Sequence, residues 1–192
     1  MLSLRRHGAA LLLALALAGC AGVSRHAEEA VLERPDVGQV VEFEFTGRIS
    51  VRQGDTHHAA NLSWQHGLAY DEILLSSPLG QGLAQLSRDA SGARLITADQ
   101  QRLEAADWES LATQALGAEL PVAQLPRWLV ADAPPGARRD AAGRPASFRQ
   151  DGWSVQYQSY QSESALALPR LIVVGRDDIE VRLKIDAWQR LR

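Results

Sequence analysis

A chain of 192 residues is long enough for one domain with a hydrophobic core of its own. Hydrophobic residues make up 46% and charged residues 22%, the proportions of an ordinary globular protein. The formal net charge of -3 argues against nucleic acid as a partner, because nucleic-acid-binding domains usually carry a basic patch or stripe. The single cysteine excludes an intrachain disulfide.

The start of the chain has the pattern of a bacterial secretory signal. Arg5 and Arg6 are followed by an apolar segment at 8–18, rich in Leu and Ala, and small residues end it in the sequence L-A-G-C. The apolar segment is shorter than the ~20 residues that a membrane-spanning helix needs. We therefore predict that residues 1–19 are a cleaved signal peptide.

The L-A-G-C sequence, which ends at Cys20, resembles the lipobox of bacterial lipoproteins. This resemblance implies cleavage before Cys20, an S-diacylglycerol on its thiol and an N-acyl group on its new N-terminus. The following residue is Ala21 and not Asp, which by resemblance to proteobacterial lipoprotein sorting implies the outer membrane. The alternatives are a plain secretory signal with an incidental cysteine, or an uncleaved helix.

Removal of the signal makes the remaining chain more acidic. Two of the 20 basic residues lie in the signal, which leaves 18 basic against 23 acidic residues and a net charge of -5. We expect no adhesion of such a chain to anionic lipid through its net charge, so the acyl chains are the expected anchor.

Residues 20–38 are polar, and we predict a lipidated N-terminus followed by a flexible tether. From residue 39 the apolar residues recur with a period of two, which predicts a half-buried strand up to Val51. Gly47 lies on the apolar face of this strand and predicts a bend or bulge. Further strands with turns between them are predicted around 60–64, 70–75, 83–87, 93–97 and 102–104.

The middle of the chain is predicted to be helical. Asp107 can cap a helix that Gly117 ends, and a second short helix opens at Pro121 and kinks or restarts at Pro126. Residues 137–145 are expected to form a polar loop. Three strands follow, around 153–157, 171–174 and 179–185.

The order of strands, helices and strands defines the expected fold class. The connections are too short for βαβ crossovers, so the strands must run antiparallel. The fold class is therefore α+β and mainly β, with one face of the sheet in solvent and the other covered by the inserted helices.

Catalytic and metal-binding patterns are weak. His57 and His58 are adjacent on a strand, so their side chains point to opposite faces and cannot bind one ion together. Asp177-Asp178 is ordinary turn composition. Residues 80–82, G-Q-G, are followed by a strand and not by the helix of a phosphate-binding loop. We predict a protein that is not an enzyme and has no metal and no cofactor beyond the lipid on Cys20.

Apolar residues in unusual places are more informative. Leu79 lies at the centre of a predicted turn, between Pro78 and Gly80, where solvent contact is expected. The five tryptophans are spread over strands and helices. Such residues usually fill a core, but a short, Pro-broken helical layer over a bent sheet can also leave a slot for a ligand.

Seven segments, in this order and spacing, resemble the LolB family of outer-membrane lipoproteins. They are L-A-G-C, F-T-G-R-I-S-V, L-S-W-Q, S-S-P-L-G, L-P-R-W-L-V-A-D-A-P-P-G, W-S-V-Q-Y-Q-S-Y and L-P-R-L-I-V-V-G-R-D-D-I-E-V-R-L-K-I-D-A-W. The resemblance covers essentially the whole chain, with residues 39–192 as the LolB-like domain. It implies a curved antiparallel sheet, an open half-barrel similar to the periplasmic carrier LolA, with a helical lid over an apolar cavity.

The same resemblance implies a function. LolB proteins accept lipoproteins from LolA and insert them into the inner leaflet of the outer membrane, facing the periplasm. They have neither catalytic residues nor a nucleotide. The expected partners are therefore LolA, client lipoproteins with their acyl chains, and outer-membrane lipid, and the expected state is a monomer. The alternatives are a lipocalin-like lipoprotein that binds a lipid or small apolar ligand, and a structural lipoprotein with a solid core.

The resemblance also singles out candidate site residues. An exposed leucine on a loop between strands is implied to contact the membrane in this family, and Leu79, flanked by Pro78 and Gly80, matches it. Strand and helix phase selects six candidates for the lining of the acyl-chain cavity: Phe43, Phe45, Trp64, Leu74, Trp128 and Leu183. Phase alone does not separate cavity lining from packed core.

Overall fold

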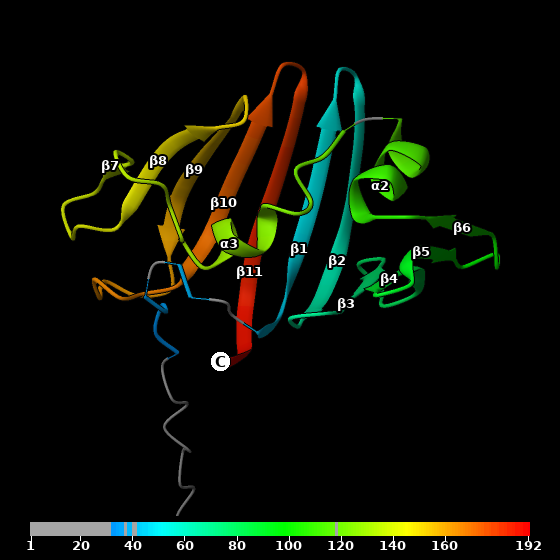
Figure 1. Ribbon diagram of the computed structural model, residues 1–192, viewed down its shortest axis with the longest axis horizontal. Coiled ribbons are helices and arrows are strands. Elements are labelled where there is room, and N and C mark those ends of the chain that lie inside the picture. Colours follow the sequence, from blue (N-terminus) through cyan, green and yellow to red (C-terminus); the bar gives the residue numbers. More distant parts are fainter. Residues whose placement is uncertain (1–31, 37, 40–41, 118) are drawn as a thin grey trace, which may run out of the picture. The chain divides into compact units, whose positions relative to one another are not determined.

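The structure is a computed structural model that describes residues 32–36, 38–39, 42–117 and 119–192 (Figure 1). The predicted signal peptide, Cys20 and most of the predicted tether lie outside the described residues. Leu32 begins the compact unit that contains the sheet and both helices.

Within the described residues, eleven strands form one sheet in the order β6-β5-β4-β3-β2-β1-β11-β10-β9-β8-β7, and every pair of neighbours is antiparallel. The strands are β1 (Phe43–Gln53), β2 (Thr56–His66), β3 (Asp71–Ser76), β4 (Gly82–Asp89), β5 (Gly92–Thr97), β6 (Arg102–Ala105), β7 (Arg138–Arg139), β8 (Pro145–Gln150), β9 (Trp153–Tyr160), β10 (Pro169–Arg176) and β11 (Ile179–Leu191). The sheet is a meander whose first and last long strands pair at its centre. It is open, with β6 and β7 at its edges, so the predicted fold class is confirmed.

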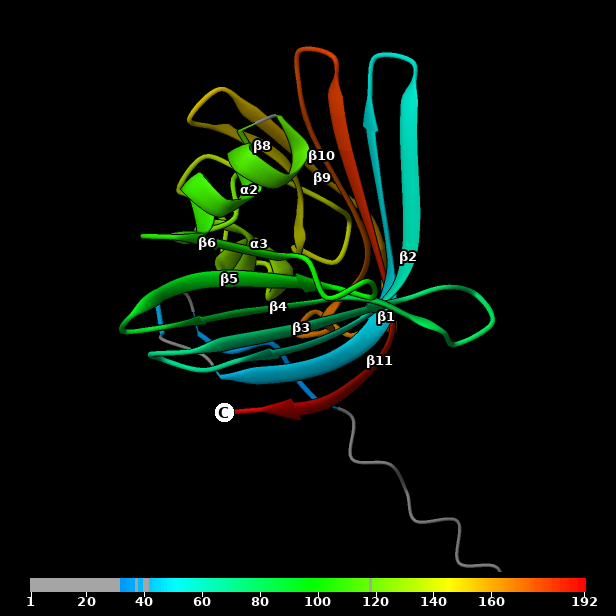
Figure 2. The same cartoon turned by 90° about the vertical axis from the view of Figure 1, so that its right-hand side faces the viewer.

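The sheet bends where β1 meets β11. Two register shifts occur there, between Glu44 and Phe45 and between Thr46 and Gly47. A Cβ atom on Gly47 would lie 2.1 Å from the carbonyl oxygen of Lys184, so only glycine allows the two strands to approach this closely. The predicted bend at Gly47 is confirmed, and Figure 2 shows the strands curving around the helices.

Two local signals set the first helix, α2 (Trp108–Leu116). The Asp107 carboxylate accepts a hydrogen bond from the Ser110 backbone N–H at 2.7 Å, and Gly117 ends the helix in the left-handed conformation with φ of 67°. Both predictions are confirmed. The second helix, α3 (Leu125–Leu129), is shorter than predicted, because residues 121–124 form a turn before it.

The predicted polar loop at 137–145 is confirmed for residues 140–144 and wrong at both of its ends. Residues 138–139 form β7, and Pro145 begins β8. These strands escaped detection because β7 has only two residues and β8 has a single large apolar side chain, Phe148, so neither shows a clear alternation. The strands that were predicted are all present, and β11 continues through Trp188 to Leu191.

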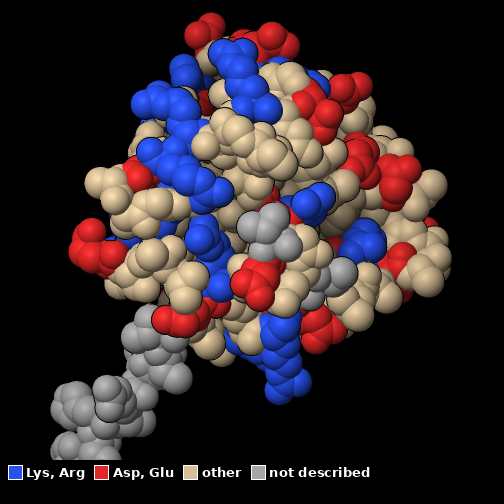
Figure 3. Space-filling view, turned by 60° about the vertical axis from the view of Figure 1, so that its left-hand side comes forward, with Lys and Arg blue, Asp and Glu red and all other residues tan. Residues whose placement is uncertain are grey.

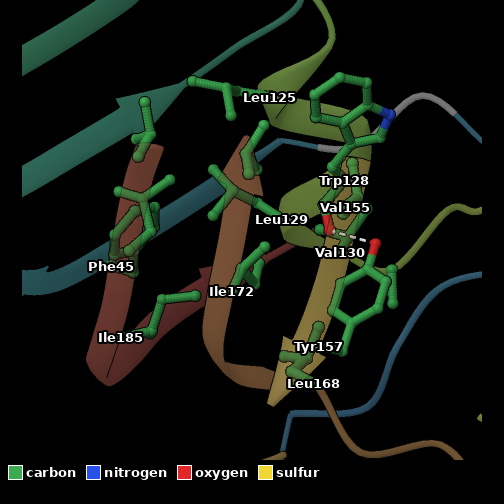
Figure 4. Close-up of a cluster of buried hydrophobic side chains, with 14 of the residues drawn as sticks. Phe45, Leu125, Trp128, Leu129, Val130, Val155, Tyr157, Leu168, Ile172 and Ile185 are labelled. Atoms are coloured by element: carbon green, nitrogen blue, oxygen red, sulfur yellow. Dashed lines mark hydrogen bonds between the residues drawn. The ribbon is translucent and has the colours of Figure 1, made fainter. Parts of the chain in front are cut away.

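The helical insertion lies on the concave face of the sheet (Figures 1 and 2). Its second part, residues 125–133, packs against β8 to β11 and fills that half of the concavity with side chains. Figure 4 shows Trp128, Leu129 and Val130 against Val155 and Ile172, and each of these is at most 2% exposed. The Tyr157 hydroxyl donates a hydrogen bond to the Trp128 carbonyl oxygen at 2.8 Å, which fixes the segment to β9.

We predict that Gly47→Ala lowers the free energy of unfolding by about 2–3 kcal/mol, because the added methyl group must displace the Lys184 backbone. Urea denaturation at neutral pH measures this change. Gly82→Ala is the matched control: a Cβ there meets no atom within 4 Å, and we expect a change within about 0.5 kcal/mol. Equal stability of the two variants would contradict the close approach at Gly47.

Candidate functional site: an apolar cavity and an exposed leucine

An apolar cavity of about 400 Å³ lies between the sheet and α2. The sheet contributes side chains from β1 to β5 and β11, including Leu62, Ile73 and Leu86, and α2 contributes Trp108 and Leu111. No Asp, Glu, Lys or Arg is among the described residues that line it. Its volume is within the range of about 300–1,000 Å³ typical of small-molecule pockets.

The cavity stays hollow because small residues face it from both layers. Ala60 on β2 and Ala84 on β4 line it from the sheet, and Ala112 and Ala115 line it from α2. Ala112 and Ala115 are neighbours of Leu111 along a helix that would otherwise present large side chains to the sheet. Because the methyl groups of these alanines are too short to reach the opposite layer, a gap remains between the layers. The larger residues around it form its walls.

The structure separates the six predicted lining residues into three groups. Trp64 and Leu183 line the cavity. Phe43, Phe45 and Trp128 are at most 1% exposed and belong to the packed core, and none of them lines the cavity. They face inward, as their strand and helix phase predicted, but Phe43 and Phe45 pack against Trp188, and Trp128 packs against Phe148 of β8.

The prediction for Leu74 is corrected. Its side chain is 47% exposed and lies in a groove on the opposite, convex side of the sheet, whereas Ile73 and Leu75 face the cavity. Residues 73–75 are three consecutive apolar residues, so the sequence of β3 does not reveal which of its faces is buried. Leu86 on β4 and Leu95 on β5 also line the cavity, although neither was among the six predicted lining residues. Each lies in a strand whose apolar and polar residues alternate, and this alternation could have identified them.

A buried carboxylate holds one end of the cavity. The Asp71 side chain is 1% exposed, and its oxygens accept hydrogen bonds from Trp64 Nε1 at 2.8 Å and Arg88 Nε at 2.7 Å. His66 Nδ1 lies 2.6 Å from Asp71 Oδ1. Burial opposes the charged carboxylate, but the hydrogen bonds from His66, Trp64 and Arg88 outweigh it and hold the pKa of Asp71 below its usual value. The cluster fixes the Trp64 ring where it meets the cavity.

Leu79 lies at the tip of the loop between β3 and β4 and is 90% exposed. The loop is a tight turn: the Gly80 backbone N–H donates to the Ser77 carbonyl oxygen at 2.9 Å, and Gly80 has φ of 83°. The Asn61 side chain donates to the same oxygen at 3.0 Å, which attaches the loop to β2. Figure 2 shows this loop projecting on the side of the sheet away from the helices.

Other candidate chemistry finds no support in the described residues. They bring together no group of three or more His, Cys, Asp or Glu residues that could hold a metal ion. His57 and His58 are both exposed on β2, and only His58 is on the face that carries the cavity. None of the described helices is both long and apolar enough to cross a membrane.

An open antiparallel half-barrel, with short helices over an apolar cavity, defines a protein of the apolar-ligand-binding class. The family model described as outer membrane lipoprotein LolB matches residues 41–188. The chain belongs to the LolB family.

Relatives named outer-membrane lipoprotein LolB match over nearly their full length. The protein from Azoarcus sp. (strain BH72) is 39% identical and aligns over 92% of this chain and 91% of its own. The one from Thiobacillus denitrificans is 38% identical, over 97% and 98% respectively. A crystal structure of a LolA superfamily protein from Nitrosomonas europaea matches with a TM-score of 0.44 and 9% identity, covering 79% of this chain and 85% of that one.

We predict that Asp71→Asn lowers the free energy of unfolding by about 2–4 kcal/mol at pH 7, because Arg88 loses its carboxylate partner. The folded-state pKa of Asp71 is lowered, so its stabilising contribution is complete above the ordinary Asp pKa of about 3.9 and is lost as the pH falls through the folded value. Urea denaturation at pH 7 and pH 3 should therefore show a smaller difference between variant and wild type at pH 3. The outward-facing neighbour Glu72→Gln is the control, and a difference for Asp71→Asn that is independent of pH would contradict the ionised state.

Proposed function

We propose that this protein is the outer-membrane receptor for lipoproteins. It accepts them from the periplasmic carrier LolA, shields their acyl chains in the cavity that Trp64 and Leu183 line, and inserts them into the inner leaflet of the outer membrane. Membership of the LolB family supports this function. The observation that carries it is an apolar cavity of about 400 Å³ in the same domain as an apolar side chain that is 90% exposed.

The cavity answers a physical need. An acyl chain loses ~0.8 kcal/mol for each CH₂ group that is exposed to water, so a lipoprotein crosses an aqueous compartment only when its chains are covered at every stage. A lining without charged groups covers them and imposes no desolvation cost on a buried ion. Directed movement then results from successively stronger binding, which ends in the bilayer.

Residence at the membrane depends on lipid at Cys20. An S-diacylglycerol and an N-acyl chain provide more than the two chains that already give stable anchoring. Twelve residues from Cys20 to Val31 precede the described domain, and a fully extended chain of that length reaches about 40 Å. The domain, as a monomer facing the periplasm, can therefore remain close to the inner leaflet while it receives its client.

Leu79 acts at the delivery step and not in anchoring. A leucine transferred from water into lipid gains only ~1.5–3 kcal/mol, which is small beside the gain from three acyl chains. Its place at the tip of a hydrogen-bonded turn holds it in solvent, away from the sheet and its core. Contact of this side chain with the bilayer brings the loaded domain to the lipid surface.

We predict that Leu79→Glu leaves folding and transfer from LolA unchanged but lowers the rate of lipoprotein insertion into liposomes at least tenfold. A carboxylate at the tip cannot enter the hydrocarbon without a large desolvation cost. The assay follows a labelled lipoprotein from LolA to the receptor and then to vesicles. Leu103→Glu, at a leucine on β6 that is 37% exposed, is the control and should insert normally. Normal insertion by Leu79→Glu would remove the proposed role of this side chain.

We further predict that Ala112→Phe lowers the rate of lipoprotein uptake from LolA at least tenfold, because the added ring fills the cavity from α2. Since the ring enters an existing void, the free energy of unfolding should change by less than about 1.5 kcal/mol. Thr113→Phe, one position along the same helix and exposed, is the matched control. A wild-type protein that binds a fatty acid but takes no lipoprotein from LolA would instead favour the lipocalin-like alternative.

A further inference from the structure

The convex face of the sheet is divided by charge. Side chains alternate along each strand and residues paired in register share a face, so the residues that alternate with the inward-facing ones form the outward-facing set. Over β7 to β11 and β1 and β2, the outward positions carry seven basic residues and three acidic ones: Arg48, Arg52, Arg138, Arg149, Arg182, Lys184 and Arg190 against Glu44, Glu180 and Asp186. We call these ten residues and the neutral side chains between them the basic face.

The other wing of the sheet has no excess of basic residues. The outward positions of β3 to β6 carry Arg94 and Arg102 together with Glu72, Asp89 and Glu104, and Arg94 pairs with Glu104 at 2.9 Å. The asymmetry contrasts with the sequence, whose portion beyond the predicted signal has a net charge of -5. Figure 3 shows a band of Lys and Arg side chains on one flank of the molecule.

The basic face remains available to an outside partner despite its internal ion pairs. Asp186 lies between Arg48, at 3.2 Å, and Lys184, at 3.3 Å, so one carboxylate serves two cations. Glu180 likewise lies between Arg52 and Arg182, at 3.6 and 3.5 Å. The four basic side chains are 40–57% exposed. Arg138 and Arg149 are exposed and have no carboxylate within 4 Å among the described residues.

The exposed leucine lies on the same side of the molecule. The base of its loop, at Gly80 and Gly82, lines one groove together with Thr46 of β1 and Asp186 of β11, on the convex side. Figure 2 shows the loop extending beyond the outer surface of the β1–β2 hairpin. An apolar side chain that projects beside a basic surface is the combination that binds to a bilayer with anionic head groups.

We propose that the basic face binds the surface of an anionic lipid bilayer and orients the domain so that Leu79 meets the membrane. The inference rests on the proposed function and adds to it the lipid class and the docking surface. Basic side chains attract anionic lipid, while the acidic remainder of the chain is repelled by it, so the same field that attracts one face turns the others away. An acidic protein surface could match the charge, but it would not explain the projecting leucine.

The orientation can be measured on the mature lipidated protein in vesicles. Cys20 is the only cysteine, and its thiol carries lipid in the proposed mature form, so an introduced cysteine is a unique site for a fluorophore. Gln156→Cys places the label on the exposed, outward side of β9, within the basic face, and Gln114→Cys places it on the exposed side of α2. The vesicles are phosphatidylcholine alone or phosphatidylcholine with about 30% phosphatidylglycerol, which gives an anionic surface, and an aqueous quencher reports shielding.

We expect the label at 156 to be shielded on phosphatidylglycerol vesicles only, and the label at 114 to stay accessible on both. Each basic charge removed should lower the docking equilibrium about fivefold, so Arg149→Gln/Arg182→Gln should lower it about 25-fold. Arg102→Gln, on the other wing of the sheet, should leave it unchanged. Salt at about 1 M, where the screening length is about 3 Å, should abolish the shielding.

Equal shielding on both kinds of vesicle, or an equal loss in Arg102→Gln, would overturn the proposal. Shielding at 156 that appears on neutral vesicles only after a soluble acidic protein is added would assign the face to a protein partner and would also overturn it. Transfer of a lipoprotein from LolA to the receptor, measured in detergent-free solution with the same variants, tests the proposed function separately. Intact transfer without lipid-dependent shielding would contradict the basic face alone.

Discussion

One connection must cover the whole concave face of an open sheet. The strands at the two edges, β6 and β7, are joined by residues 106–137, and this segment provides both helices. An apolar sheet face left in water would cost roughly 25 cal/mol for each Å² of exposed surface, so the segment has to pack against it. It is too short to fill the face uniformly, and the distribution of its large side chains decides which part is solid.

The two halves of the concavity differ for this reason. Trp128, Leu129 and Val130 fill the half against β8 to β11, and the hydrogen bond from Tyr157 to the Trp128 carbonyl oxygen fixes that packing. Over the other half, α2 contacts β5 and β6 through a separate small cluster of Ala93, Trp108 and Leu111. The cavity therefore lies under α2, the helix with the smaller hydrophobic cluster. It is located between that cluster and the larger core around residues 125–133.

The walls of the cavity are held in place by contacts within the protein. At Gly47 the backbones of β1 and β11 approach too closely for any side chain, and this fixes the curvature of the sheet. On β3 the buried Asp71 joins Trp64, His66 and Arg88, from the two adjacent strands β2 and β4, through hydrogen bonds. A buried ionic cluster specifies one geometry even where its net contribution to stability is modest. A preformed cavity is the result, which lowers the entropy lost when an apolar chain enters.

Local chemistry was readable from the sequence, and long-range packing was not. Asp107 and Gly117 bound α2 through contacts within a few residues, and the clean alternation of β1 and β11 identified their buried faces. Leu74 was misplaced because its strand is apolar on both sides, and Phe43, Phe45 and Trp128 were placed in the cavity because inward phase is common to core and lining. Contacts across the chain separate the two, such as those of Phe43 and Phe45 with Trp188 and of Trp128 with Phe148. Net charge has the same weakness: a value of -5 for the chain after its predicted signal conceals a basic face, because it contains no information about which strands carry the charges. On the proposed function, this distribution matters more than the total, since acyl chains on Cys20 keep the domain near the membrane but leave its orientation free, and only a directional surface can orient it.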